Sequence, residues 1–211
     1  MSDIQSSYDR LAQTYADHLS GELEHKPFDR QMLLWLLQRV GEGRGPICDL
    51  GCGPGQVARF LSDHGARVDG IDFSAAMVEQ ARSLSPDLPF SQGDMRALTG
   101  IADATYGGIA AFYSLIHLTP TEIPAALTEL RRVLVPGGTL LVTFHLGSEV
   151  RHLDSMWDVP VSIDFHFFER DQMKAWLEGA GFVLEEAIER DPYPAPIEVA
   201  TRRAYLFARK P

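Results

Sequence analysis

The sequence predicts an α/β fold, in which a doubly wound sheet of seven mainly parallel strands ends in an antiparallel strand. Short apolar segments alternate with amphipathic helical patterns along most of the 211 residues. A glycine-rich turn, Asp49-Leu50-Gly51-Cys52-Gly53-Pro54-Gly55, joins the first apolar segment to a helical pattern. A hydrophobic content of 45% supports one substantial core, and the length is short for two.

The first part of the chain is expected to contain two helices and then a strand–helix–strand unit. Amphipathic spacing predicts the helices at residues 2–19 and 27–40. A strand at 46–50 ends at the glycine turn, a helix follows at 55–64, and a second short strand lies at 67–71. Such a βαβ unit places its two strands parallel to each other.

The alternation of helices and strands continues to residue 145. The expected elements are a helix at 75–84, strands at 88–91 and 107–113, a helix at 121–133 and a strand at 138–145. Because helices separate the strands, the sheet should be mainly parallel and covered on both faces. The loops after the first four strands then meet at one edge, where open sheets of this kind bind ligands.

The last third of the chain begins with a long insert. Residues 146–168 are interpreted as a loop whose aromatic and histidine side chains form a cavity wall. A helix at 169–179 and strands at 182–189 and 202–209 complete the sheet with a closing hairpin. The proline-rich residues 192–196 are interpreted as a bend between these two strands.

Composition narrows the function. A formal charge of −10 makes nucleic acid an unfavourable partner, because binding there depends on Lys and Arg. The sequence shows no secretory pattern and no apolar run of the roughly 18–20 residues that a membrane span needs. Cys48 and Cys52 are expected to be small buried residues rather than a disulfide or metal ligands. We therefore expect a soluble cytoplasmic protein.

The glycine turn and a following acid predict a nucleoside site. Asp72 lies 21 residues beyond Gly51, the distance at which a βαβ unit places an acid against ribose hydroxyls. The glycines follow the pattern G-x-G-x-G, and Gln56 stands where a dinucleotide fingerprint has its third glycine. This pattern favours a ligand with a ribose and an amino-acid carboxylate but no phosphate, which describes S-adenosylmethionine.

These residues resemble the motifs of the class I S-adenosylmethionine-dependent methyltransferases, small-molecule type, whose fold is Rossmann-like. Asp49–Gly55 resembles the first motif, Gly70-Ile71-Asp72-Phe73-Ser74 the second, and Gly93-Asp94-Met95 the third. Leu134-Val135-Pro136-Gly137-Gly138 resembles the loop before the fifth strand. The resemblance covers nearly the whole chain and implies S-adenosyl-L-methionine as cofactor and S-adenosyl-L-homocysteine as product.

The resemblance also implies roles for individual residues. Asp49 would meet the methionine ammonium, Asp72 the ribose diol, Phe73 the adenine face and Asp94 the adenine amino group. The full set of expected cofactor-binding residues is Tyr15, Asp49, Gly51, Gly53, Gly55, Asp72, Phe73, Asp94, Met95 and Tyr113. Residues 1–211 would form one domain, divided into an N-terminal helical lid (1–42), a cofactor-binding core (46–145), a substrate-side insert (146–168) and a C-terminal part (169–211).

The acceptor is expected to be a small molecule. The loop after the fourth strand lacks the Asn/Asp-Pro-Pro-aromatic sequence of methyltransferases that act on nucleic-acid bases. His117 and His145 end the fourth-strand loop and the fifth strand, and each is either a general base or a pocket residue that binds a backbone carbonyl. The residues expected to bind the acceptor are Tyr8, His18, His117, His145, Trp157, His166 and Phe168.

The sequence leaves two other functions open. A non-catalytic module that senses S-adenosylmethionine and acts through a protein partner would share the cofactor motifs, but its acceptor cavity would be inaccessible or absent. A nicotinamide-dependent oxidoreductase is favoured by the acid after the second strand and disfavoured by Gln56. We expect no metal, no membrane and no nucleic-acid partner, and a monomer or homodimer.

Overall fold

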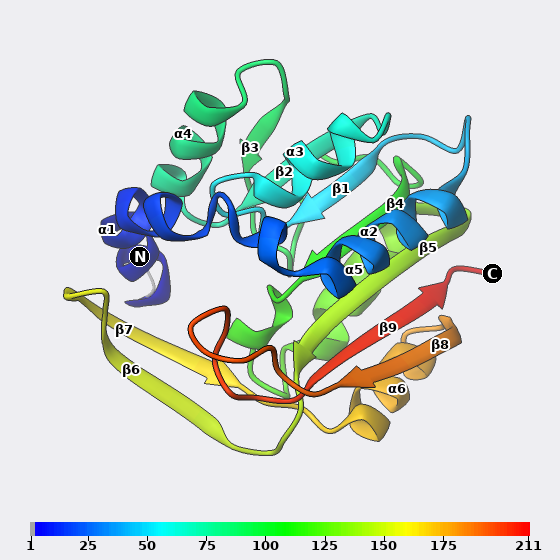
Figure 1. Cartoon of the computed structure of the whole chain (residues 1–211). Helices are drawn as coiled ribbons and strands as arrows, with labels where there is room; N and C mark the ends of the chain where they lie inside the picture. The colour runs from blue at the N-terminus through cyan, green and yellow to red at the C-terminus, as the bar shows by residue number, and fades with distance from the viewer. Residues whose placement is uncertain (1–2) are drawn as a thin grey trace.

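The central feature of the fold is a seven-stranded sheet with the order β3-β2-β1-β4-β5-β9-β8, seen in a computed structural model that describes residues 3–211 (Figure 1). Its strands are β1 (Ile47–Leu50), β2 (Val68–Asp72), β3 (Phe90–Gln92), β4 (Tyr106–Phe112), β5 (Leu134–His145), β8 (Val183–Arg190) and β9 (Arg203–Arg209). Strand β9 pairs antiparallel with both β5 and β8, and the other pairs are parallel. The predicted Rossmann-like sheet with its antiparallel last strand is confirmed.

Helices cover both faces of the sheet, as the alternation of elements predicts (Figure 1). They are α1 (Asp3–Leu19), α2 (Pro27–Val40), α3 (Gln56–Asp63), α4 (Ala75–Leu84), α5 (Ile123–Val133) and α6 (Arg170–Gly179), with short 3-10 turns η1 (Glu22–His25) and η2 (Leu115–His117). Residue 2, the expected start of the first helix, lies outside the described residues.

Successive residues of the central strands point to opposite faces and build two separate cores. Ile109 and Ala111 of β4 pack in the cluster that contains the buried side of α5 and α6. Ala110, between them, packs in the cluster formed with α2, α3 and α4. This period of two is the geometry of a pleated strand covered on both faces.

The insert differs from the expected loop. It forms a two-stranded antiparallel hairpin, β6 (Val150–Met156) and β7 (Val159–His166), outside the main sheet. Trp157 and Asp158 connect the strands, and both have positive φ, of 47° and 62°. Two consecutive residues of positive φ match a tight hairpin turn whose twist suits the flanking strands.

The hairpin and helix α1 pack against each other beside the carboxyl ends of the parallel strands (Figure 1). Leu11 of α1 is fully buried with Val161 and Ile163 of β7. The Ser162 backbone N–H donates to the Ser7 hydroxyl at 2.9 Å, which fixes the register between helix and strand. No helix among residues 3–211 is both long and apolar enough to cross a membrane.

Candidate functional site

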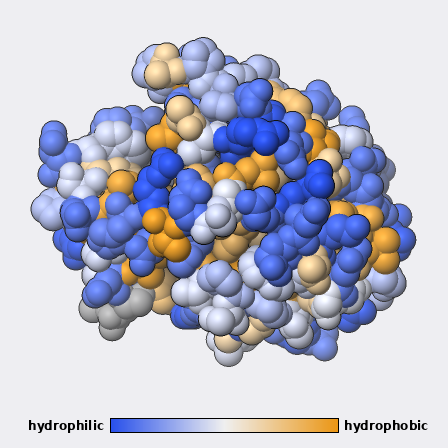
Figure 2. Space-filling model, turned by 90° about the horizontal axis from the view of Figure 1, so that it is seen from below, coloured by the Kyte–Doolittle hydropathy of each residue, from blue (hydrophilic) through white to orange (hydrophobic). Residues whose placement is uncertain are grey.

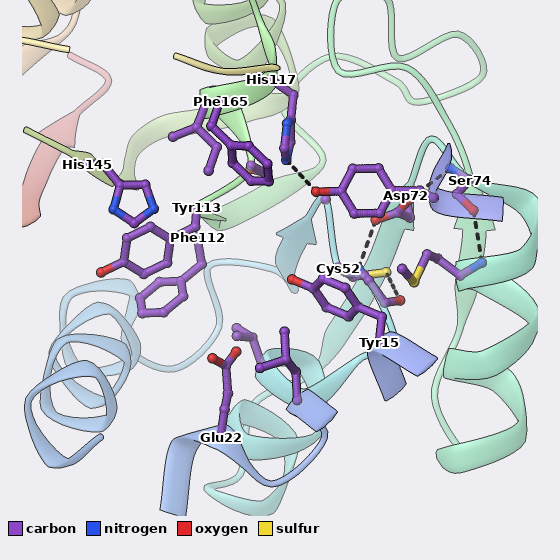
Figure 3. Close-up of a pocket in the computed structure, with 18 of the residues that line it drawn as sticks. Tyr15, Glu22, Cys52, Asp72, Ser74, Phe112, Tyr113, His117, His145 and Phe165 are labelled. Atoms are coloured by element: carbon purple, nitrogen blue, oxygen red, sulfur yellow. Dashed lines mark hydrogen bonds between the residues drawn. The ribbon is translucent and has the colours of Figure 1, made fainter. Parts of the chain in front are cut away.

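A cavity of about 950 Å³ lies at the carboxyl ends of β1, β2, β4 and β5, between α1, the hairpin and the β8–β9 connection (Figure 3). Ligand pockets in proteins span roughly 300–1,000 Å³, so this cavity is at the large end of that range. Figure 3 shows Asp72, Cys52 and Tyr15 on one side of it, and Tyr113 and His145 on the other.

The three glycines of the turn have different structural roles. Gly51 and Gly53 line the cavity and have positive φ, of 72° and 51°. A Cβ on Gly51 would lie 2.4 Å from the Ser114 Cβ, whereas one on Gly53 would meet only Tyr15, at 3.8 Å. Gly55 is outside the lining, and a Cβ there would lie 2.9 Å from the Phe90 ring. Gly53 therefore exposes backbone to a ligand, and Gly55 allows α3 to pack on the sheet.

Asp72 and Asp49 place two carboxylates at this side of the cavity. Asp72 accepts hydrogen bonds from the backbone N–H groups of Gly53 and Ser74, both at 2.8 Å, and so ties the glycine turn to the start of α4. Asp49 accepts one from Ala58 at 2.9 Å and is only 1% exposed. Burial raises the pKa of both carboxyls, that of Asp49 to about 7.

Asp94, Met95 and Phe73 also line the cavity, at the ends of β2 and β3. Arg96 donates to the Asp94 carboxylate through Nε and Nη2, at 3.0 and 2.7 Å, and pairs with Glu122 at 2.6 Å. The side-chain hydrogen bonds from Arg96 lower the pKa of the Asp94 carboxyl. Asp94 is thus ionised and held at the rim of the cavity.

Helix α1 reaches the fourth-strand loop through a phenol–imidazole pair. The Tyr8 hydroxyl lies 2.9 Å from His117 Nε2, and His117 Nδ1 lies 3.3 Å from the Asp164 carbonyl oxygen. Because a carbonyl oxygen only accepts, Nδ1 carries the proton and Nε2 accepts from Tyr8. Burial lowers the pKa of His117 to about 4 and raises that of Tyr8, so both are neutral near pH 7.

Tyr15 and Trp157 close the cavity beside this pair. The Tyr15 ring meets Tyr8 edge-on, with centroids 6.0 Å apart, and Trp157 edge-on at 5.8 Å. Burial raises the pKa of the Tyr15 hydroxyl. The three aromatic rings bring helix α1 and the hairpin turn together over the glycine turn.

His145 and Tyr113 form the opposite side of the cavity, with ring centroids 5.3 Å apart. His145 Nδ1 lies 2.8 Å from the Thr201 hydroxyl. Burial, followed by the charge of Arg203, lowers the pKa of His145 to about 3. Tyr113 has a φ of 53°, a strained value for a residue with a side chain, and such strain is often found at functional sites.

Four residues expected in the site lie outside the cavity lining: Gly55, His18, His166 and Phe168. His18 is exposed and stacks on Trp157 at 4.4 Å. Phe168 is 3% exposed and packs in the core beside Phe144. His166 stacks on Phe168. These four residues therefore lie away from the cavity, and the remaining expected residues all line it.

The β8–β9 connection contributes part of the wall, whereas the sequence favoured a plain bend there over one that overhangs the site. Residues 191–202, which we call the strap, place residues 195–200 in the lining. Ile197 and Val199 are 38% and 61% exposed at its edge. Figure 2 views the side with the hairpin and strap, where hydrophobic residues gather near the centre between hydrophilic ones. The proline-rich composition of 192–196 was the only sequence signal for this segment.

Two buried polar atoms in the cavity lining have no hydrogen-bond partner in the described part of the chain and indicate which kind of ligand the cavity fits. They are Ser114 Oγ and Gln56 Oε1. Buried polar groups are nearly always satisfied, so both atoms are suited to a polar ligand. Together with the carboxylates of Asp49 and Asp72 and the open face of Gly53, they fit an amino acid joined to a ribose. Within residues 3–211 no group of three or more His, Cys, Asp or Glu side chains could hold a metal ion.

Comparisons with known proteins agree with this geometry. A family model described as a methyltransferase domain matches residues 47–138. The chain is 31% identical to malonyl-[acyl-carrier protein] O-methyltransferase of Pseudescherichia vulneris over 73% of this chain and 58% of the relative. It is 35% identical to 2-phytyl-1,4-naphtoquinone methyltransferase of Thermosynechococcus vestitus over 65% of this chain and 62% of the relative. The chain spans about three fifths of the length of these relatives.

Solved structures share the fold. A SAM-dependent methyltransferase from Methanosarcina mazei superposes with a TM-score of 0.72 at 16% identity, covering 82% of this chain and 95% of that one. A glycopeptide N-methyltransferase complexed with S-adenosylmethionine superposes with a TM-score of 0.67, also at 16% identity, covering 86% and 94%. At this identity the likeness concerns the fold alone.

Proposed function

The chain belongs to the class I S-adenosylmethionine-dependent methyltransferases, and from this premise we propose that it transfers a methyl group from S-adenosylmethionine to a small-molecule acceptor. One observation carries the proposal: the glycine turn and the carboxylates of Asp49 and Asp72 face a single cavity. When bound, the cofactor supplies an electrophilic methyl group on a sulfonium. Carboxylates favour the positive charges of the sulfonium and ammonium groups.

The residues around the glycine turn would hold the cofactor. Asp72 accepts from the ribose hydroxyls, and Asp49 faces the ammonium group. Phe73 and Met95 flank the adenine, with Asp94 as acceptor for its amino group. The position of these residues in one continuous lining supports this assignment.

The aromatic side of the cavity would hold the acceptor. Tyr8, Tyr113 and Trp157 form its walls, and His117 and His145 present neutral imidazoles to it. His117 Nε2 is the nitrogen that can take a proton, once the Tyr8 hydroxyl turns from it to the acceptor. With a pKa of about 4, His117 is a weak base. The site therefore favours an acceptor whose nucleophile needs little deprotonation.

Calorimetric titration with S-adenosylhomocysteine tests the cofactor, with NAD as the control ligand. We expect one-to-one micromolar binding of S-adenosylhomocysteine alone. Asp72→Asn should weaken it about 10- to 150-fold, because a charge-assisted hydrogen bond contributes roughly 1.5–3 kcal/mol. Asp69→Asn is the matched control, since Asp69 lies on the same strand outside the cavity lining. Equal affinity in wild type and folded Asp72→Asn protein would refute the assignment.

The same proposal includes the cellular setting of the enzyme. We place it in the cytoplasm as a monomer or homodimer that acts on a small molecule and not on nucleic acid. Two buried free cysteines, Cys48 and Cys52, support a reducing compartment. The charge of −10 supports a partner other than nucleic acid.

A further inference from the structure

The two sides of the cavity differ in charge. Asp49, Asp72 and Asp94 line the side of the glycine turn. On the opposite side, Arg203 of β9 lines the cavity beside His145 of β5, its cross-strand partner. Glu198 of the strap also lines the cavity here and lies 3.0 Å from Arg203. The partners of both side chains therefore decide whether Arg203 can also bind a ligand.

Only one nitrogen of the Arg203 guanidinium is hydrogen-bonded within residues 3–211. Nη1 donates to the Thr201 carbonyl at 2.6 Å and lies 3.0 Å from Glu198 Oε1. Nε and Nη2 have no such partner and are not sealed from the cavity, although the side chain is only 4% exposed. These two nitrogens form the planar edge that binds a carboxylate through two parallel hydrogen bonds.

Glu198 does not occupy this edge. Its carboxylate accepts from Arg190 Nη1 and Nη2, at 2.6 and 3.2 Å, and from the Tyr193 backbone N–H at 2.6 Å. Arg190 therefore takes most of the hydrogen-bonding capacity of Glu198, and the edge of Arg203 formed by Nε and Nη2 has no bond to Glu198.

The charges around His145 indicate a positive potential at this side. Besides burial, the cations Arg203, Arg151 and Lys26 lower the pKa of its imidazole, and Glu198 alone raises it. An anion placed next to His145 would lie in a favourable field, in a setting where low solvent access strengthens charge interactions.

We propose that Arg203 forms an anion subsite in the acceptor half of the cavity and binds a carboxylate carried by the methyl acceptor through its Nε and Nη2 groups. The carboxylate is a recognition group that orients an apolar, ring-bearing molecule whose body packs on Phe112, Tyr113 and Phe165. The identification of this ligand as the methyl acceptor rests on the methyl transfer proposed above. The binding of a carboxylate by Arg203 does not depend on that transfer.

Matched acids and amides test the subsite directly. Benzoate, 3-phenylpropanoate and 4-phenylbutanoate, each with its primary amide, are titrated calorimetrically into protein saturated with S-adenosylhomocysteine. We expect at least one acid to bind at least tenfold more tightly than its amide. The subsite is refuted if no acid of the series binds, or if acids and amides bind equally.

Two neighbouring arginines provide the variant and its control. In Arg203→Gln, the ratio of the affinity for each acid to the affinity for its amide should fall close to one. The affinity for S-adenosylhomocysteine should stay unchanged. Arg202→Gln should leave the ratio as in wild type, because Arg202 is 58% exposed and outside the lining. If the acid-to-amide affinity ratio of Arg203→Gln equals that of wild type, the proposal is overturned.

A second variant keeps the proposal testable if Arg203→Gln does not fold. Arg203→Lys keeps the charge but loses the planar edge, so the ratio should fall at least threefold; an unchanged ratio overturns the proposal. If wild-type protein fails to bind S-adenosylhomocysteine, the cofactor assignment fails, and the same titrations on the protein alone still report on Arg203.

Discussion

Binding of S-adenosylhomocysteine should release protons and strengthen with pH, because Asp49 carries a raised pKa. Burial brings this pKa to about 7, with one backbone hydrogen bond, from Ala58, opposing the shift. A carboxyl with this pKa is roughly 10% ionised at pH 6, half ionised at pH 7 and roughly 90% ionised at pH 8. If the ligand ammonium requires the carboxylate, affinity should rise about tenfold between pH 6 and pH 8.

Calorimetry in two buffers of different ionisation enthalpy measures this linkage. At pH 7 we expect release of about half a proton per ligand bound. Asp49→Asn should bind more weakly and lose the pH dependence. Adenosine, which has no ammonium group, is the ligand control and should show no slope in wild type. A flat affinity profile in wild type, or the same slope in Asp49→Asn, would refute the role given to Asp49.

Two further predictions concern stability and the glycine turn. Arg190→Met should lower the free energy of unfolding by about 3–5 kcal/mol in urea titrations, because it leaves the buried carboxylates of Asp29 and Glu198 without their shared cation; a loss below 1 kcal/mol would contradict this. Gly51→Ala and Gly53→Ala both place a side chain at positive φ, at a cost of about 1–2 kcal/mol. Only Gly51→Ala adds a clash, with Ser114, so thermal melting should fall more for it, and similar melting of the two variants would count against the packing argument.

The sequence predicted the sheet because its signals are local. The strands from 46–50 to 138–145 are short apolar runs, and helices separate all of them except the third and fourth. The glycine turn marks the first crossover from strand to helix. The hairpin of residues 150–166 has no such signal, since β6 is largely exposed and its polar and apolar residues do not alternate cleanly. Its turn, Trp157-Asp158, also lacks the Asn-Gly or Asp-Gly pair that usually marks positive φ at two successive positions.

Side-chain placement depended on contacts that spacing does not encode. Helical spacing correctly places Tyr8 and Tyr15 on one face of α1. His18 instead stacks on Trp157 outside the cavity lining. Trp157 is 139 positions away in the sequence, in a segment expected to be a loop. The sequence favoured a plain bend over the wall formed by the strap for the same reason. Glu198 is 2% exposed because it is held by Arg190 and Arg203, which lie on two strands that flank the strap.

The neutrality of both cavity histidines fits a site for a cationic ligand. His117 and His145, with pKa values of about 4 and about 3, stay uncharged at any pH at which Asp49 ionises. A protonated imidazole in the same cavity would repel a sulfonium and compete for Asp49 and Asp72. Burial of the rings removes that competitor and leaves His117 Nε2 as a hydrogen-bond acceptor for Tyr8. The same desolvation that makes His117 a weak base thus preserves the negative field of the two carboxylates. The side of the cavity at the glycine turn therefore favours cation binding, and His117 is poorly suited to strong base catalysis.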